Sequence, residues 1–504
     1  MEAVKHAHSA FQSFRLTTAR ERARLLRKWY DLVAENASDL AILITWENGK
    51  PLADAKGEVT YAANFLEWFS EEAPRVYGDN IPASIAGNRI ITIRQPVGVC
   101  GIITPWNFPA AMITRKVGPA IAAGCTIVAK APGETPFTAL ALAELGRRAG
   151  IPDGVFNVVT TLVNTPEIGK ELCENHIIKK ISFTGSTPVG KLLMQQCAPT
   201  LKKLSFELGG NAPFIVFDDA DLDKAVNGAI ASKFRSSGQT CVCANRIYVQ
   251  SGIYSQFADM LAQQVSSFKI GGGYTEGVTH GPLIHEKAVD KVHSHVQDAQ
   301  EKGAKIVTGG SGLSELGPNF YGMTVLTGMK KGMKLHEEET FGPVAGLFEF
   351  ETEDDVIGMA NSSEVGLAGY FYSRDVNRIW RVAEALEVGM VGINTGLISD
   401  PAAPYVSRRL YHAIWNICTY NLWNKQIRRG ETIWFWPRGV EIWNGRIYHY
   451  QDDDFWRGLK TKYQFSISKK KKFAGAWGRL VIIIFDNSIK WYMPCASIFH
   501  QKHN

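Results

Sequence analysis

The sequence predicts an α/β protein with two lobes built on parallel sheets. Between about residue 97 and residue 250, short apolar runs rich in β-branched residues alternate with stretches of helical length, which is the pattern of βαβ units. The same alternation continues after Gly209, which indicates a second α/β lobe. The chain has 504 residues, 45% of them hydrophobic, so it is long enough to bury more than one core.

The first lobe is predicted from five strands and the helices between them. The strands are expected at 97–103, 125–129, 155–159, 180–183 and 203–206. Helical patterns separate them, for example at 137–149 and 189–196. A helix between successive strands lets them pair in parallel. We assign residues 1–78 and 97–208 to this lobe.

The second lobe is predicted over residues 209–404, with strands at 214–217, 247–250 and 388–393. The segment 79–96 interrupts the first lobe. It is polar and punctuated by glycine and proline before the apolar run 90–93, so we expect an extension or a hairpin there. We find no internal repeat.

The composition changes after Pro404. Five of the 13 tryptophans precede that residue and eight follow it. The last hundred residues also carry a run of four lysines at 469–472 and lack helical or strand periodicity over any useful length. We therefore interpret residues 405–504 as a divergent tail, and we expect it not to pack onto the two lobes.

Bulk properties exclude several classes of protein. A net charge of +6 is mild for this length, and no basic stretch with interleaved aromatics precedes residue 460, so we expect no nucleic-acid partner. Eight cysteines lie without metal-ligand spacing, which predicts no metal site and favours a reducing compartment. No apolar run approaches the roughly 20 residues of a membrane span. The acidic residues among the N-terminal arginines argue against a mitochondrial presequence.

Four segments carry residues suited to catalysis. Cys241 follows a glycine-led turn of small residues, although an isolated cysteine is more often a buried small hydrophobe. Glu207 ends an apolar strand before two glycines, where a partly desolvated carboxylate can act as a base. Asn107 is held between two prolines and could donate to an oxyanion. The turn from Gly185 through Ser186 to Gly190 opens a helix and would suit a pyrophosphate, but it lacks the usual glycine spacing.

Taken together, these segments resemble the aldehyde dehydrogenase superfamily. The order and spacing match from about residue 3 to Pro404, and the matching segments are Asn107, Lys130, 185–190, Glu207, Cys241 and 339–343. The resemblance implies a Rossmann-type cofactor domain, an α/β catalytic domain and a small oligomerisation hairpin at 79–96. Within the superfamily, segments 112–119 and 235–245 resemble succinate-semialdehyde dehydrogenases.

The resemblance also implies a role for each matching residue. Cys241 would attack the aldehyde, Asn107 would hold the oxyanion, and Glu207 would activate the hydrolytic water. Arg115, Arg235 and Ser399 would bind the substrate carboxylate, which suits forked guanidinium donors. The positions expected to bind NAD or NADP are Thr104, Trp106, Lys130, Gly133, Gly185, Ser186, Gly190, Glu339 and Phe341. Cys243, one residue beyond the nucleophile, is a candidate for reversible oxidation.

Two departures from the superfamily pattern matter. Its usual carboxylate three residues after the cofactor lysine is replaced by Gly133, with Glu134 one position later, so NADP use is plausible as well as NAD. The family's closing segment should follow residue 402, but the sequence diverges there. We interpret the tail as the result of a gene-model error, intron read-through or frameshift. The tail makes the family-type homo-oligomer doubtful.

Three functional hypotheses follow. The first is oxidation of succinate semialdehyde to succinate, a step in 4-aminobutyrate degradation. The second is a dehydrogenase for another aldehyde, such as glutarate semialdehyde. The third is a catalytically dead relative that only binds. The resemblance implies a mitochondrial location, although no presequence is visible, and a cytoplasmic location stays open.

Overall fold

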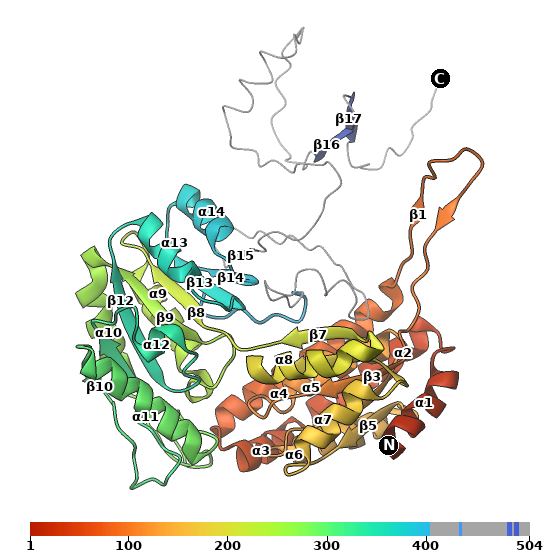
Figure 1. Ribbon diagram of the computed structural model, residues 1–504, viewed down its shortest axis with the longest axis horizontal. Coiled ribbons are helices and arrows are strands. Elements are labelled where there is room, and N and C mark those ends of the chain that lie inside the picture. Colours follow the sequence, from red (N-terminus) through yellow and green to blue (C-terminus); the bar gives the residue numbers. More distant parts are fainter. Residues whose placement is uncertain (404–432, 436–480, 486–487, 493–504) are drawn as a thin grey trace, which may run out of the picture. The chain divides into compact units, whose positions relative to one another are not determined.

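The computed structural model describes residues 1–403, 433–435, 481–485 and 488–492 (Figure 1). The chain divides into two compact units, Met1–Pro437 and Arg438–Asn504. The first unit contains both predicted α/β lobes. Within the second unit, strands β16 (Val481–Phe485) and β17 (Ser488–Tyr492) pair antiparallel.

Four helices open the chain. They are α1 (Glu2–Phe14), α2 (Ala19–Glu35), α3 (Ala37–Asn48) and α4 (Leu52–Glu72). A capping box between Thr18 and Glu21 starts α2, because the two residues satisfy each other's free backbone N–H groups. Gly49 ends α3 with a φ of 87°, a left-handed conformation that glycine adopts without strain.

The first sheet is parallel throughout, with strand order β5-β4-β3-β6-β7. Its strands are β3 (Val99–Ile103), β4 (Thr126–Lys130), β5 (Phe156–Val159), β6 (Ile178–Thr184) and β7 (Lys203–Glu207). The five predicted strands are thus confirmed to within three residues at each end. The strand order reverses between β3 and β6, and ligands of such sheets bind beyond the carboxyl ends of the strands at this point.

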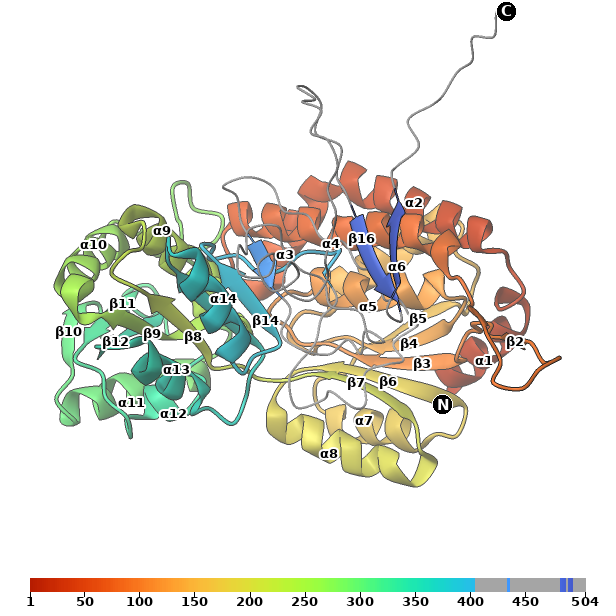
Figure 2. The same ribbon diagram turned by 90° about the horizontal axis from the view of Figure 1, so that it is seen from above.

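Helices cover both faces of this sheet (Figure 2). The first four helices together with α5 (Ala111–Ala122) and α6 (Pro136–Ala149) pack around Trp29, Leu142 and Ile102. On the other face, α7 (Thr165–Glu174) and α8 (Thr187–Cys197) contribute Leu172 and Leu193 to a second core. Both faces of the strands are therefore apolar, as parallel sheets require.

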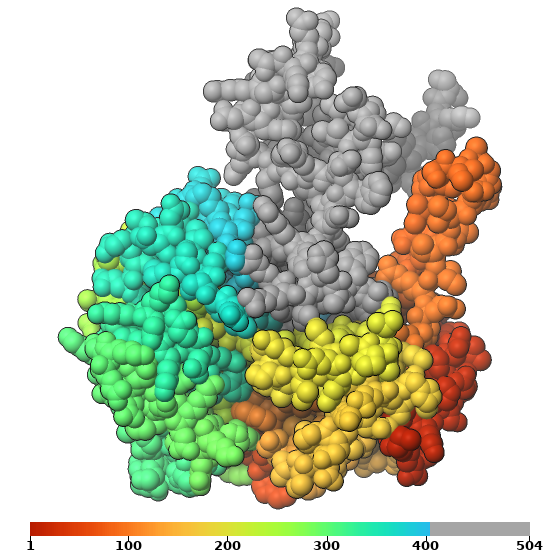
Figure 3. Space-filling view, in the orientation of Figure 1, coloured from red at the N-terminus to blue at the C-terminus, as the bar shows by residue number. Residues whose placement is uncertain are grey.

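The segment 79–96 forms the predicted hairpin. Strands β1 (Asn80–Ile81) and β2 (Ile90–Ile91) pair antiparallel. The hairpin stands away from the body of its unit (Figure 3). Its isoleucines are exposed, Ile91 by 71% and Ile93 by 74%.

The second sheet has the strand order β10-β11-β12-β9-β8-β13-β14-β15. Its strands are β8 (Ala212–Val216), β9 (Ala244–Gln250), β10 (Lys305–Thr308), β11 (Thr324–Thr327), β12 (Val344–Phe350), β13 (Ala368–Tyr372), β14 (Met390–Ile393) and β15 (Ile433–Phe435). Only the edge strands β10 and β15 are antiparallel to their neighbours. The predicted strands 214–217, 247–250 and 388–393 correspond to β8, β9 and β14, and sequence reasoning missed the others.

Helices cover this sheet on both sides. They are α9 (Leu222–Lys233), α10 (Tyr254–Ser266), α11 (Glu286–Glu301), α12 (Lys334–Glu337), α13 (Glu353–Asn361) and α14 (Val376–Ala385). Short 3-10 turns lie at Ala73–Arg75, Ala198–Thr200, Arg235–Gly238 and Ser251–Ile253. Two separate cores, one containing Phe257 and one containing Val296, lie on the two faces. The α/β fold class is therefore confirmed, while the predicted domain boundaries stay predictions.

Most of the predicted tail 405–504 lies outside the described residues. The expectation that nothing there would pack onto the lobes is wrong for one strand, because β15 pairs with β14, with Ile433 opposite Ile393. A backbone ladder needs no amphipathic pattern, since the exposed edge of β14 offers unpaired N–H and C=O groups to any extended segment. Among the described residues, no helix is long and apolar enough to cross a membrane.

Candidate active site

A strained turn presents Cys241. Before it, Ser236, Ser237 and Gly238 all have positive φ, at 52°, 54° and 75°. A Cβ atom on Gly238 would lie 2.1 Å from the carbonyl oxygen of Gly342. Only glycine therefore fits this position. Such strain in successive residues is typical of functional sites.

Cys241 meets Glu207 across the junction of the two lobes. Its Sγ lies 3.1 Å from Glu207 Oε1. Burial, followed by the negative charge of Glu207, raises the pKa of the Cys241 thiol well above its ordinary value, and Arg115 opposes this increase. The resting group is thus a thiol that donates its S–H to Glu207. Desolvation thus disfavours the charged form of the resting thiol.

Glu207 also contacts Arg115, from helix α5. Arg115 Nη1 donates to Glu207 Oε2 at 3.0 Å, and both side chains are 8% exposed. Thr184 Oγ1 donates to the same oxygen at 3.3 Å. Both oxygens of the Glu207 carboxylate are therefore occupied in this structure.

Asn107 is fixed from two sides. Its Nδ2 donates to the carbonyl oxygen of Gln239 at 2.9 Å, which ties it to the segment before Cys241. The backbone carbonyl oxygen of Asn107 accepts a hydrogen bond from Lys50 Nζ at 2.8 Å. An amide carries two hydrogens, so one remains for a further acceptor. This geometry is compatible with the predicted oxyanion donor.

The predicted carboxylate binders come together around one aromatic ring. The guanidinium carbons of Arg115 and Arg235 lie 5.8 Å and 5.9 Å from the ring centroid of Tyr61. Arg235 also lies 5.0 Å from the centroid of Phe108. Both guanidinium groups thus make cation–π contacts with the Tyr61 ring, and Arg115 also contacts the base Glu207.

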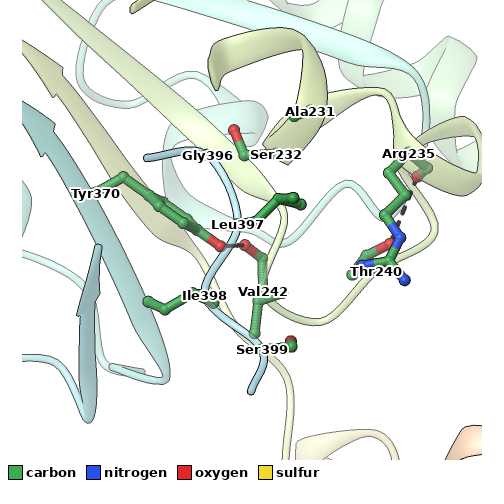
Figure 4. A pocket seen from close by; sticks show the side chains of 10 residues that line it. All are labelled: Ala231, Ser232, Arg235, Thr240, Val242, Tyr370, Gly396, Leu397, Ile398 and Ser399. Atoms are coloured by element: carbon green, nitrogen blue, oxygen red, sulfur yellow. Dashed lines mark hydrogen bonds between the residues drawn. The ribbon is translucent and has the colours of Figure 1, made fainter. Parts of the chain in front are cut away.

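Ser399 lies in a pocket that Arg235 also lines (Figure 4). The wall of this pocket includes Tyr370, whose hydroxyl donates to the carbonyl oxygen of Val242 at 2.7 Å. Since Val242 follows Cys241 directly, the pocket adjoins the nucleophile. The structure therefore places Arg235 and Ser399 beside one cavity.

The predicted cofactor residues lie at the carboxyl ends of the first sheet. Ser186 is the N-cap of α8, and its side chain makes no capping hydrogen bond. A Cβ atom on Gly185 would lie 2.5 Å from the Phe183 ring, and one on Gly190 would lie 2.4 Å from Leu208. The start of α8 is thus held close to the sheet. Pro188 has no N–H and the Gly190 N–H donates to Ser186, so the N–H groups of Thr187 and Val189 are the candidates to meet a phosphate.

Among the remaining cofactor candidates Thr104 and Lys130 are buried, and the others are partly buried. Lys130 ends β4, and burial lowers the pKa of its ammonium group. Thr104 Oγ1 is buried without a hydrogen-bond partner within the described part of the chain. Trp106 packs edge-on against Phe341, with ring centroids 5.8 Å apart, and burial raises the pKa of Glu339 to about 7. Among described residues, no cluster of three metal-ligating side chains occurs.

Gly133 lies against the loop after β5. A Cβ atom there would be 2.6 Å from Leu162 Cδ1 and 2.9 Å from the carbonyl oxygen of Thr161. Any side chain at this position would force that loop to move. The absence of the family's carboxylate is therefore built into the packing.

Cys243 lies one residue beyond the nucleophile. Its thiol is buried, and burial raises its pKa. It donates to the carbonyl oxygen of Lys233 at 3.1 Å. Both Cys241 and Cys243 are free thiols in this structure.

Sequence reasoning missed four side chains that support the site. Lys50 and Glu58 form a buried ion pair, and the ring of Tyr61 makes cation–π contacts with both arginines. Lys116 lies one residue after Arg115; its Nζ is 3.0 Å from Ser182 Oγ, and burial lowers its pKa to about 8. Helical spacing puts residues 54, 58 and 61 on one face of α4, and Lys50 lies just before that helix. That spacing was the available signal.

Comparison with known proteins identifies relatives over most of the chain. The pattern described as the aldehyde dehydrogenase family matches residues 1–406. An NADP(+) succinate-semialdehyde dehydrogenase of Schizosaccharomyces pombe is 61% identical over 405 residues, which cover 80% of this chain and 81% of the relative. A glutarate-semialdehyde dehydrogenase of Pseudomonas putida is 58% identical over 403 residues, which cover 80% and 83%. Relatives named as mitochondrial match at 55% identity. A crystal structure of an NADP dependent enzyme of Escherichia coli superposes with a TM-score of 0.79 at 59% identity, covering 80% and 84%.

Proposed function

This chain belongs to the aldehyde dehydrogenase family, and from that premise we propose that it oxidises succinate semialdehyde to succinate with NADP or NAD. One observation carries the choice of substrate. Two guanidinium groups, from Arg115 and Arg235, lie over the Tyr61 ring beside the nucleophile. A short aldehyde that ends in a carboxylate fits such a site, because the charged end is bound while the aldehyde reaches Cys241.

Catalysis begins at the hydrogen bond between Cys241 and Glu207. As Sγ attacks the aldehyde carbon, Glu207 takes the thiol proton across 3.1 Å. This transfer overcomes the raised pKa of the buried thiol. The oxygen of the resulting thiohemiacetal accepts a hydrogen bond from the Asn107 amide. Loss of hydride leaves a thioester on Sγ. Glu207 releases the thiol proton to solvent and, as a carboxylate again, deprotonates the water that adds to the thioester carbon. The C–S bond breaks, Sγ leaves as a thiolate and regains a proton from Glu207, and succinate leaves.

The start of α8 and the ends of β3 and β4 would hold the cofactor, which supplies the hydride acceptor when bound. The N–H groups after Ser186 and the helix dipole suit its pyrophosphate. The buried, unpartnered Thr104 hydroxyl and the ammonium of Lys130 add polar partners. The carboxylate of Glu339 would accept from ribose hydroxyls.

NADP use is supported at Gly133. A carboxylate near the adenosine ribose repels a 2′-phosphate. The packing of Gly133 against Leu162 leaves no room for a carboxylate side chain at this position. The relatives named for NADP(+) agree with this proposal. The cofactor domain is therefore proposed to accept NADP as well as NAD.

Glutarate semialdehyde is the second candidate substrate, because two relatives at 58% identity carry that name. It has one more methylene group than succinate semialdehyde, and a methylene in an apolar pocket discriminates by only about 10–200-fold. We also propose a homo-oligomer built through the 79–96 hairpin. A mitochondrial or cytoplasmic location is compatible with the mixed origin of the relatives.

A substrate panel tests this function. Purified protein is offered succinate semialdehyde, glutarate semialdehyde and butanal with NADP or NAD, and the absorbance of reduced cofactor is followed. We expect succinate semialdehyde to have the highest kcat/KM, at least about 30-fold above butanal, as for loss of a buried charge partner. Cys241→Ser is the control and should be inactive, since an alcohol lacks thiolate character. Equal kcat/KM for the two four-carbon aldehydes would rule out the carboxylate site.

A further inference from the structure

Arg115 joins the proposed substrate site to the proposed base. Its Nη1 donates to Glu207 Oε2 at 3.0 Å, and its Nη2 donates to Tyr61 Oη at 2.5 Å. The rings of Tyr61 and Phe65 lie 5.8 Å and 5.2 Å from its guanidinium carbon. The Arg115 side chain, which we propose binds the substrate carboxylate, therefore already binds the carboxylate of Glu207.

Both carboxylate oxygens of Glu207 also accept hydrogen bonds from the protein. Oε1 accepts from the Cys241 thiol, and Oε2 accepts from Arg115 and from Thr184. The pair of Arg115 and Glu207 is only 8% exposed on either side, so little water competes for it. During thioester hydrolysis a water must donate to one of these carboxylate oxygens. Once the thioester has formed, Sγ carries no proton and Oε1 is open to that water, while Arg115 still holds Oε2 and fixes the orientation of the carboxylate.

The substrate itself provides the competitor. A carboxylate binds a guanidinium best through two parallel N–H donors, and Arg115 divides its donors between Glu207 and Tyr61. Arg235 lies against the rings of Tyr61 and Phe108, so both guanidinium groups contact the Tyr61 ring. A substrate carboxylate held first by Arg235 would thus approach Arg115 and compete with Glu207 for it.

We propose that the substrate carboxylate displaces Glu207 from Arg115, so that binding at the acidic end frees the base needed at the aldehyde end. This inference rests on the proposed function. It makes Arg115 a specificity-determining residue in a second sense, because an aldehyde without a carboxylate reaches Cys241 but leaves Glu207 tied. Neutral aldehydes then form the thioester and hydrolyse it slowly.

Two variants separate this exchange from a simple binding role. Arg115→Met removes the guanidinium but keeps a flexible apolar stem, and Arg235→Met is the matched variant that leaves the Arg115–Glu207 pair in place. Each is assayed with succinate semialdehyde and with butanal, which has the same four-carbon chain. Rapid mixing measures the burst of reduced cofactor, which reports thioester formation, and the steady rate after it, which reports hydrolysis.

We expect Arg115→Met to change the two substrates in opposite directions. Its kcat/KM for succinate semialdehyde should fall by about 30-fold or more, while its steady rate on butanal should rise about threefold or more, because Glu207 is released. Arg235→Met should lower kcat/KM for succinate semialdehyde without raising the steady rate on butanal. A steady rate on butanal that stays the same or falls in Arg115→Met, with an unchanged melting temperature, would overturn the exchange.

A measurement on the unmodified protein covers the case in which Arg115→Met does not fold. Acetaldehyde and acetate together resemble the two halves of succinate semialdehyde. Acetate, added at constant ionic strength against chloride, should raise the steady rate on acetaldehyde several-fold by occupying Arg115 and Arg235. No increase, or inhibition, at saturating acetate contradicts the exchange. If the protein oxidises no aldehyde with either cofactor, the proposed function fails instead.

Discussion

The environment of a few side chains determines what this site can do. Cys241 is a reactive group in an unfavourable setting, since burial raises its pKa, and its contact with Glu207 supplies the nearest base. Sequence reasoning identified Cys241, Glu207 and Asn107 because each lies at a strand end or a glycine turn. It could not show that Glu207 contacts both Cys241 and Arg115, because the three come from β7, the turn before β9, and α5.

Glu207→Gln tests the two steps assigned to this carboxylate. A glutamine cannot take a proton, so hydrolysis of the thioester should nearly stop, with turnover reduced by about 10²–10⁴-fold. Thioester formation should slow less, since another base such as bulk hydroxide can remove the thiol proton. The measurement is a burst of reduced cofactor, near one equivalent per site, followed by a very slow steady rate. An unchanged steady rate would show that Glu207 is not the base.

Glu339 gives a prediction about pH. Its pKa is raised to about 7 by burial, so the carboxyl is protonated below that value and charged above it. Ribose hydroxyls donate hydrogen bonds to the charged form and stabilise it. Cofactor affinity should therefore strengthen as pH rises through about 7 and level off above it, with at most a tenfold change per pH unit. Titration of intrinsic fluorescence with NADP measures this, and Glu339→Gln should abolish the slope. The same slope in the variant would assign it to another group.

At the scale of helices and strands, the sequence predicted the cofactor sheet better than the catalytic one. The strands β3 and β4 are buried along their whole length, so they read as continuous apolar runs between helical patterns. In the second lobe, the residues of β10 alternate between exposed and half-buried. In β13, three consecutive aromatic residues follow Gly369, so the strand shows no apolar–polar alternation. Strand β15 follows a long stretch outside the described residues, and its pairing depends on an available sheet edge rather than on its own sequence.

The missed elements also include the support beneath Asn107. Helix α4 supplies Glu58, which accepts from the backbone N–H groups of Ala110 and Ala111 at 2.8 Å and 3.4 Å. Lys50, just before that helix, bonds both Glu58 and the Asn107 carbonyl. No local pattern in 104–111 could reveal these contacts, because their partners lie about fifty residues earlier. This buried pair fixes the segment that carries the oxyanion donor.

Lys50→Met tests that support. The ammonium and the carboxylate are 2% and 0% exposed, so the variant leaves Glu58 as an uncompensated buried charge. We expect the free energy of unfolding to fall by about 3–5 kcal/mol, measured by urea titration, and the burst of reduced cofactor to slow as Asn107 loses its anchor. Lys56→Met, at an exposed lysine on helix α4, is the matched control. The double variant Lys50→Met with Glu58→Gln should recover part of the lost stability; no recovery would contradict the charge argument.

At the scale of the whole molecule, the proposed site is complete within the first unit of one chain. Cys241, Glu207, Asn107 and both arginines all belong to Met1–Pro437. The hairpin, by contrast, contributes no residue to the site. It exposes Ile81, Ile85, Ile90, Ile91 and Ile93 on two-residue strands that cannot be stable alone. Surface this apolar, with open strand edges, is typical of an interface with another copy of the chain.

The final prediction concerns that hairpin. Ile91→Lys and Ile93→Lys together place two charges on the proposed contact surface, and burying them unpaired costs several kcal/mol. We expect the double variant to elute from size-exclusion chromatography, with light scattering, at a smaller assembly state than the parent protein. Leu316→Lys, at a residue that is 43% exposed in a loop of the catalytic lobe, is the control and should leave the assembly state unchanged. If both variants keep the parent's mass, the hairpin does not mediate assembly. If the smaller species still oxidises succinate semialdehyde, the site works within one chain, as the placement of its residues requires.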